Sequence, residues 1–258
     1  MKYVKLVFSP TGGTEKAAEI VASEWSETAE TIDLTDAAAD FSKRRIEPDD
    51  LVLIALPSYG GRVPRLAAER LSRIQGNRAK CVLMCVYGNR AYEDTLIEMA
   101  DIVKAAGFSA VAAISAVAEH SIMREYASGR PDREDEGRLK SYANEILEKI
   151  KAGTLNGEVQ VPGNRPYKKS GGVGLVPKAN AHCTRCGLCA ESCPAEAISK
   201  ENLKTADRQK CISCMRCVAM CPQNARKINN LLVSAASQAI KKACSERKEA
   251  EIFIKGFR

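Results

Sequence analysis

The chain has 258 residues, of which 45% are hydrophobic and 28% are charged, as in an ordinary globular protein with one large domain or two modest ones. No stretch reaches the roughly 18–20 apolar residues of a membrane-spanning helix. The apolar run at residues 1–8 is too short for a secretion signal, so we expect a cytoplasmic protein without a membrane span. The net charge of +7 is typical of a solvated surface, and it is also compatible with acidic proteins, anionic surfaces or nucleic acid.

Strand-like and helix-like segments alternate through the first 152 residues. Short runs rich in Val, Leu and Ile predict buried strands, and between them apolar residues recur at helical spacing. The predicted strands cover residues 1–8, 30–34 (the weakest), 50–56, 80–87 and 109–117, and the predicted helices cover 14–27, 63–74, 91–106 and 132–152. Single helices between strands indicate right-handed crossovers. We therefore predict an α/β fold with a doubly wound, parallel, five-stranded sheet in the order 2-1-3-4-5.

The loop at residues 9–14, SPTGGT, joins the first predicted strand to the first predicted helix. Its N–H groups lie at the positive end of a helix dipole, its glycines let an anion approach the backbone, and its hydroxyl groups add donors. It lacks the ending of a Walker A motif and the spacing of a dinucleotide-binding loop. The loop therefore predicts a site for a phosphate monoester, although a tight turn capped by Thr11 is the alternative.

Two further loops, residues 57–62 (PSYGGR) and 87–92 (YGNRAY), follow the third and fourth predicted strands, where ligands bind in such sheets. Together with SPTGGT they resemble flavodoxins, whose phosphate loop reads Ser/Thr-x-Thr-Gly-x-Thr. The resemblance implies FMN, with tyrosines stacked on the flavin ring and backbone groups at its polar edge, although either tyrosine could instead be ordinary surface packing. The residues expected to bind FMN are Ser9, Thr11, Gly12, Gly13, Thr14, Pro57, Ser58, Tyr59, Gly60, Gly61, Tyr87, Gly88, Asn89 and Tyr92.

The loop after the fifth predicted strand contains Glu119, His120 and Ser121, and it ends at the same edge of the sheet. His120 is a candidate proton donor at the flavin, but a loop histidine without such a role is the simpler interpretation. Residues 153–180 follow the last predicted helix. They are rich in Gly, Pro and Lys without sustained periodicity, so we predict a linker there.

Residues 181–228 contain an internal repeat, in which Cys-x2-Cys-x2-Cys-x3-Cys-Pro occurs twice, 28 residues apart. The repeat holds eight of the eleven cysteines. In a reducing cytosol such density indicates metal ligands rather than disulfides. The unit has few large apolar residues, so we expect bound metal to contribute to its folding.

This cysteine spacing is typical of iron–sulfur clusters, in which three closely spaced cysteines hold one cluster and the fourth reaches the other. The repeat resembles that of bacterial two-cluster ferredoxins. Zinc sites are the alternative, but zinc usually takes two separated CxxC pairs. We therefore predict two [4Fe–4S] clusters, one on Cys183, Cys186, Cys189 and Cys221, and the other on Cys211, Cys214, Cys217 and Cys193.

A last helical pattern, with alanines and leucines on one face, occupies the tail. We expect this face to pack on one of the two domains, although its basic side could dock an acidic partner. The predicted organisation is a flavodoxin-like FMN-binding domain at 1–152, a linker at 153–180, a small α+β ferredoxin domain at 181–228, and a C-terminal helix and tail at 229–258.

The loops PSYGGRVP and VYGNRAYEDTL ahead of the cysteine repeat resemble the flavodoxin–ferredoxin fusion family of anaerobic bacteria and archaea. The resemblance implies electron transfer between FMN and two [4Fe–4S] clusters, and to or from redox partner proteins such as a ferredoxin or an oxidoreductase subunit. A homodimer is compatible with the sequence.

Two other functions stay open at this point: an FMN-dependent reductase of a small molecule that the clusters feed, and an iron–sulfur sensor or nucleic-acid-binding regulator. The sequence has neither a helix-turn-helix pattern nor aromatic–basic interleaving, so we expect no nucleic-acid partner. No nicotinamide fingerprint or pair of carboxylates is present, so the sequence designates no catalytic residue.

Overall fold

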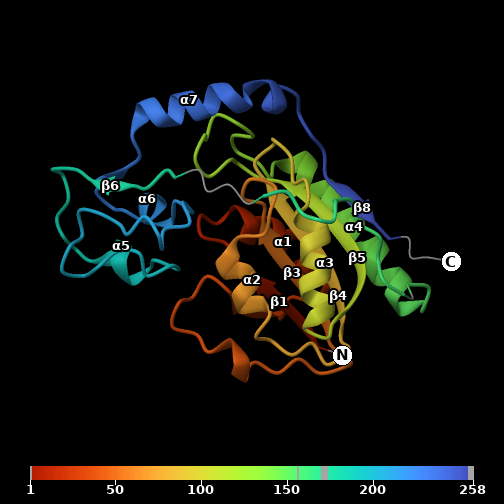
Figure 1. The fold of residues 1–258 in the computed structure, drawn as a ribbon. Coiled ribbons are helices and arrows are strands. Elements are labelled where there is room, and N and C mark those ends of the chain that lie inside the picture. Colours follow the sequence, from red (N-terminus) through yellow and green to blue (C-terminus); the bar gives the residue numbers. More distant parts are fainter. Residues whose placement is uncertain (1, 156, 170–173, 255–258) are drawn as a thin grey trace.

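The computed structural model describes residues 2–155, 157–169 and 174–254. Its main sheet has the strand order β2-β1-β3-β4-β5-β8 (Figure 1). The first five strands are parallel and follow the predicted order, whereas β8 pairs antiparallel with β5. The strands are β1 (Tyr3–Val7), β2 (Glu30–Asp33), β3 (Leu51–Pro57), β4 (Lys80–Tyr87), β5 (Ser109–Val117) and β8 (Glu251–Phe253).

The sixth strand corrects the prediction of a five-stranded sheet. β8 lies in the segment that we predicted as a C-terminal helix and tail, and its three residues are too few to show a period-two pattern. Phe253 and its neighbour Ile252 pack on opposite faces of the sheet, against its two apolar clusters. This packing ties the end of the chain to the edge strand β5.

Helices cover both faces of the sheet because its central strands are apolar on both sides. One apolar cluster contains side chains of α1 (Gly13–Trp25) and α4 (Arg133–Lys151). The other contains side chains of α2 (Arg65–Leu71) and α3 (Thr95–Ala105). The α/β, doubly wound fold is thus confirmed.

The helix α3 begins at Thr95, four residues later than predicted from position 91. Residues before it form a turn, in which Glu93 has φ 42° and Asp94 is engaged by another part of the chain. The Asp94 carboxylate accepts the N–H groups of Asn164 (2.8 Å) and Lys168 (2.7 Å). The end of β4 is therefore followed by a fixed loop rather than by a helix.

The described part of the predicted linker packs against the sheet domain. The Val159 N–H donates to the Ala110 carbonyl (2.9 Å), and Arg165 pairs with Asp101 of α3. Residues 156 and 170–173 of this segment, like residues 255–258 of the tail, lie outside the described residues. The predicted domain boundaries stay predictions.

The cysteine repeat forms a small module beside the sheet domain (Figure 1). Its elements are β6 (Lys178–Ala179), α5 (Leu188–Glu191), α6 (Arg216–Ala219) and β7 (Arg226–Lys227), and β6 pairs antiparallel with β7. Its apolar cluster contains only four buried residues: Cys193, Ala197, Ile198 and Leu203.

The helix α7 (Asn230–Ile240) runs from the cysteine module back toward the sheet domain (Figure 1). None of its residues is buried, and Leu231 is 81% exposed. The expectation that its alanine face packs on a domain is therefore wrong. One contact joins its Ser237 to the Tyr126 hydroxyl (3.0 Å).

Two short 3-10 turns complete the secondary structure, at Phe41–Lys43 and Lys241–Cys244. Across the described ranges, no helix combines the length and the apolar composition needed to cross a membrane.

Candidate cofactor-binding sites

The loops after β1, β3, β4 and β5 surround one cavity at the carboxyl ends of these strands, which we call the loop cavity. About 840 Å³ of space, part of it open solvent, lies between the residues that line it. Ten of the predicted FMN-binding residues line it: Ser9, Thr11, Gly13, Thr14, Pro57, Ser58, Tyr59, Gly60, Tyr87 and Gly88. The other four, which are not part of the lining, are Gly12, Gly61, Asn89 and Tyr92.

Two hydrogen bonds of Ser9 fix the start of the SPTGGT loop. The Ser9 N–H donates to Thr35 Oγ1 (2.8 Å), and Ser9 Oγ accepts the N–H of Glu15 (2.9 Å). Because α1 begins at Gly13, the N–H groups of residues 11–14 have no partner within the helix, and none has an acceptor elsewhere among the described residues. Four main-chain donors are thus free at the start of α1.

Close packing explains the second glycine of this loop, and a left-handed backbone explains the first. Gly12 has φ 90°, which favours glycine. A Cβ on Gly13 would lie only 3.2 Å from the Cβ of Ala118, in the loop after β5. In the described part of the chain, no lysine or arginine lines the cavity. Free amides and hydroxyl groups, without a counter-charge, fit a phosphate dianion as the sequence predicts.

Two tyrosines line the loop cavity from different loops. Burial raises the pKa of Tyr59 well above its usual value, and the nearby Cys214 thiol adds to the rise. Burial also raises the pKa of Tyr87, whose ring meets that of Tyr92 edge-on at 5.2 Å between centroids. Both phenols therefore stay protonated, and both present apolar ring surface to a ligand.

His120 reaches the loop cavity with a defined tautomer. Its Nδ1 accepts the N–H groups of Ile122 (3.1 Å) and Met123 (3.2 Å), so the neutral ring carries its hydrogen on Nε2. Burial lowers the pKa of His120, which favours this neutral form. A Cβ on Gly88 would lie 2.7 Å from the imidazole ring, so the glycine makes room for it.

The eight repeat cysteines surround two smaller cavities, and the structure groups them in the same two sets that the sequence assigns. We call the cavity of Cys183, Cys186, Cys189 and Cys221 the distal cavity. We call the cavity of Cys193, Cys211, Cys214 and Cys217 the proximal cavity. In each, three thiols come from one half of the repeat and the fourth from the other half.

The four thiols of each set line one cavity, and in the described ranges no histidine, aspartate or glutamate side chain lines either of these two cavities. Four thiols without a nitrogen or oxygen ligand fit an iron–sulfur cluster.

The two halves of the repeat share backbone geometry as well as sequence. The fourth cysteine of each half accepts an N–H four residues later: Ala197 donates to Cys193 Sγ (3.4 Å) and Ala225 to Cys221 Sγ (3.2 Å). Positive φ angles recur 28 residues apart, at Arg185 and Ser213, Gly187 and Met215, and Glu196 and Asn224. These left-handed residues turn the chain sharply enough to wrap three thiols around one cavity.

Burial makes most of the thiols around the proximal cavity reluctant to ionise. It raises the pKa of Cys214 to about 12 and that of Cys217 to about 11, although Arg226 opposes the second rise. Around the distal cavity, burial also acts to raise the pKa of Cys221, but hydrogen bonds from the N–H groups of Ala225 and its neighbours outweigh this effect and lower the pKa. Metal binding must therefore displace protons from the buried thiols.

The proximal cavity adjoins the loop cavity. Ile212, between two cysteines of the repeat, lines both, and the next residue, Ser213, lines the loop cavity. Arg216 Nη1 also donates to the Pro10 carbonyl in the SPTGGT loop (3.2 Å). Ile212 and Ser213 were not predicted as site residues, because no pattern in the sequence shows which surface of the cysteine module meets the sheet domain.

The C-terminal tail holds the loop after β4. The Asn89 side chain donates to the carbonyls of Cys244 (3.0 Å) and Glu246 (2.8 Å), and Lys248 Nζ donates to the Asn89 carbonyl (2.8 Å). Tyr92 donates to Glu251 of β8 (2.7 Å). Asn89 and Tyr92 therefore fix the tail instead of lining the cavity.

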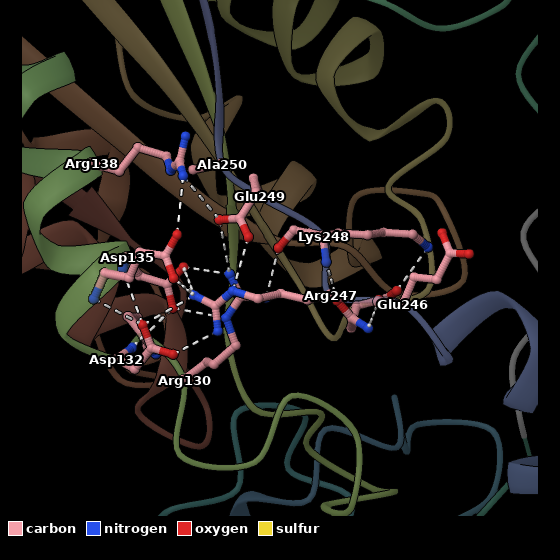
Figure 2. Close-up of polar contacts among 12 residues, drawn as sticks. Arg130, Asp132, Asp135, Arg138, Glu246, Arg247, Lys248, Glu249 and Ala250 are labelled. Carbon is pink, nitrogen blue, oxygen red and sulfur yellow. Dashed lines mark hydrogen bonds and ion pairs between the residues drawn. The ribbon is translucent and has the colours of Figure 1, made fainter.

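An ion-pair network anchors the same tail to the start of α4 (Figure 2). Arg130 Nε donates to Asp135 (2.8 Å), and both side chains are buried. Arg247 from the tail pairs with Asp132 (2.7 Å), the residue that caps α4. The pair with Arg247 holds the pKa of Asp132 well below its usual range.

Comparisons with known proteins locate one family. Residues 182–226 match the family of the 4Fe-4S dicluster domain. A search among curated proteins found no match.

Several solved structures resemble the N-terminal part at low sequence identity. The flavodoxin of Streptococcus pneumonia TIGR4 is 21% identical over 57% of this chain and 99% of its own, with a TM-score of 0.40. Oxidised flavodoxin 1 from Bacillus cereus is 15% identical over 57% of this chain and 98% of its own, with a TM-score of 0.40. Rubredoxin oxygen:oxidoreductase from the anaerobe Desulfovibrio gigas is 19% identical over 60% of this chain, with a TM-score of 0.43, and the match spans only 37% of that chain.

The N-terminal part has a flavodoxin-like topology. Five parallel strands in the order β2-β1-β3-β4-β5, with two helices on each face, are the flavodoxin-like arrangement. The chain thus joins an α/β domain of flavodoxin-like topology to a segment, residues 182–226, that matches the 4Fe-4S dicluster domain.

Proposed function

We propose that the protein transfers electrons between an FMN in the loop cavity and two [4Fe–4S] clusters on the eight repeat cysteines. The observation that carries the proposal is the position of Ile212, which lines both the loop cavity and the proximal cavity. When bound, FMN supplies one- and two-electron chemistry, and each cluster supplies one-electron chemistry. A chain with both would convert between two-electron donors and one-electron carriers.

The residues around the loop cavity would bind and orient the flavin. The free N–H groups of residues 11–14 would hold its phosphate at the start of α1. Tyr59 and Tyr87 offer ring faces to the flavin, and stacking of this kind contributes about 0.5–1.5 kcal/mol beyond burial. His120 Nε2 would offer a hydrogen-bond donor from the loop after β5.

The cysteine module would give the electrons an ordered route. The proximal cavity adjoins the flavin site, whereas the distal cavity shares no residue with the loop cavity. The distal cavity would therefore exchange electrons with an external redox protein, such as a ferredoxin or an oxidoreductase subunit. The net charge of +7 favours an acidic partner surface.

Composition analysis tests the proposal. We expect anaerobically purified protein to contain about eight iron atoms, as many sulfides and one FMN per chain. Replacing Cys214 and Cys217 together by alanine should remove the proximal cluster and leave about four iron atoms. Cys244→Ser is the matched control, since Cys244 is a buried thiol outside the repeat, and its iron content should not change.

Two results would contradict the proposal. A protein that takes up no FMN after reconstitution would leave the loop cavity without the assigned cofactor. Equal iron loss in Cys244→Ser and in the double variant would remove the assignment of the repeat cysteines as ligands.

A further inference from the structure

Arg226 is an unusual residue in the cysteine module. It is 2% exposed and is the largest side chain that is fully buried among the described residues. The repeat places it 28 residues after Ile198, which is 5% exposed and belongs to the module's apolar cluster. The second half of the repeat therefore carries a guanidinium where the first half carries a buried aliphatic side chain.

The contacts of Arg226 leave its charge without a carboxylate. Nη1 donates to the Leu203 carbonyl (2.6 Å) and to Cys189 Sγ (3.5 Å), and Nη2 donates to the Pro177 carbonyl (3.2 Å). Nε is buried and has no partner, and no acidic side chain pairs with Arg226 in the part of the chain that the structure describes. An arginine stays charged at any pH that a protein tolerates, and a buried charge without a counter-charge costs free energy.

The missing counter-charge points to the distal cavity. Arg226 lines the distal cavity and contacts Cys189, one of its four thiols. The guanidinium thus lies against the distal set of thiols.

We propose that Arg226 is the buried counter-charge of the distal iron–sulfur cluster and sets that cluster at the higher reduction potential. Reduction adds one negative charge to a cluster, and a fixed positive charge stabilises that form. Direct contact with Cys189 makes the effect larger at the distal cavity. An electron that arrives from the flavin side would then rest on the distal cluster, where a partner protein collects it.

This inference rests on the cluster assignment of the proposed function but not on flavin binding. Its test is therefore a potentiometric titration of the clusters, followed by EPR and paired with iron analysis. The variants are Arg226→Gln, which is neutral but can still donate to Leu203, and Arg226→Lys, which keeps the charge. Arg208→Met is the control, since Arg208 is an exposed arginine of the same module.

We expect Arg226→Gln to lower the higher of the two midpoint potentials and to reduce the difference between the midpoint potentials of the two clusters. Arg226→Lys should retain most of the gap, and Arg208→Met should leave both potentials unchanged. If Arg226→Gln loses the distal cluster while Arg226→Lys keeps it, the requirement for positive charge is supported in another way.

Other outcomes overturn the inference. Unchanged potentials in a fully loaded Arg226→Gln protein would make Arg226 a packing residue. Loss of the distal cluster in Arg226→Lys as well would assign the role to the shape of the guanidinium rather than to its charge. A wild-type protein with two clusters but no FMN would contradict the proposed function and leave this test intact.

Discussion

Among single residues, Thr14 has a hydroxyl group that could donate a hydrogen bond to the phosphate of FMN in the loop cavity. It lies in the first turn of α1, is 5% exposed and lines the cavity. We predict that Thr14→Val, which keeps the shape and removes the hydroxyl, weakens FMN binding about 10- to 100-fold. A hydrogen bond to a charged group contributes about 1.5–3 kcal/mol, and about 1.4 kcal/mol is a factor of ten.

Fluorescence titration of FMN into apoprotein measures this effect. Thr31→Val is a suitable control, because Thr31 is exposed on β2 and distant from the cavity lining. An affinity in Thr14→Val equal to that of the control would show that the phosphate is bound elsewhere.

His120 gives a prediction about pH. Burial lowers the pKa of His120 in the folded protein below the value of about 6.5 that a histidine has in an unfolded chain. The folded state then binds fewer protons than the unfolded state between these two values. The neutral His120 ring therefore contributes to the free energy of unfolding. This contribution is complete above about pH 6.5 and is lost as the pH falls through the pKa of His120 in the folded protein.

NMR titration of ring-labelled histidine in the oxidised protein measures this pKa directly. We expect the His120 signals to titrate below about pH 6.5 and their nitrogen shifts to show hydrogen on Nε2. His120→Gln assigns the signals, since His182 supplies the only other histidine. A His120 signal that titrates above pH 7 would contradict the buried, neutral ring.

At the scale of elements, the C-terminal tail holds the loop after β4, and Tyr87 and Gly88 at the start of this loop line the loop cavity. Lys248 Nζ donates to the carbonyls of Asn89 (2.8 Å) and Ala243 (2.7 Å), between the end of α7 and the loop after β4. We predict that Lys248→Met increases hydrogen exchange in residues 88–93, because the loop loses its charged donor. Lys242→Met, at an exposed position before the tail, is the control.

Exchange in β1 should stay the same in both variants, which separates a local effect from general destabilisation. Equal exchange of residues 88–93 in Lys248→Met and in wild type would show that β8 and the Asn89 side chain hold the loop without Lys248.

The same elements show how far the sequence predicts this structure. Local patterns were sufficient for β1, β3, β4 and β5, whose apolar runs leave few alternatives, and for the positions of the loops at their ends. The pattern was weakest for β2, in which only Ile32 is buried. Local patterns were not sufficient for β8, which gains stability only by pairing with β5, or for α7, whose apolar face suggested packing that does not occur. Contacts between distant parts of the chain decide such elements.

The candidate sites divide in the same way. Backbone donors at a helix start and the cysteine spacing are local features, so SPTGGT and the two cysteine sets could be read from the chain. Asn89 and Tyr92 looked equivalent to their neighbours in the sequence, yet the tail engages both. Ile212 entered the site only because the cysteine module docks there.

For the whole molecule, the two parts depend on different sources of stability. Two large apolar clusters enclose the sheet, whereas the cysteine module buries only a small one. We predict that removing iron with a chelator abolishes hydrogen-exchange protection in residues 178–227 and leaves β1–β5 protected. Retained protection in the module without iron would show that its fold does not depend on metal.

For the whole molecule, the central feature is that the loop cavity and the proximal cavity adjoin each other at Ile212. Flash reduction of the bound flavin, followed by the change in cluster absorbance, tests it most directly. We predict a transfer rate that does not change with protein concentration and that falls strongly when Cys214 and Cys217 are replaced by alanine. A rate proportional to protein concentration, or one that this double variant leaves unchanged, would contradict transfer within the chain through the proximal cavity.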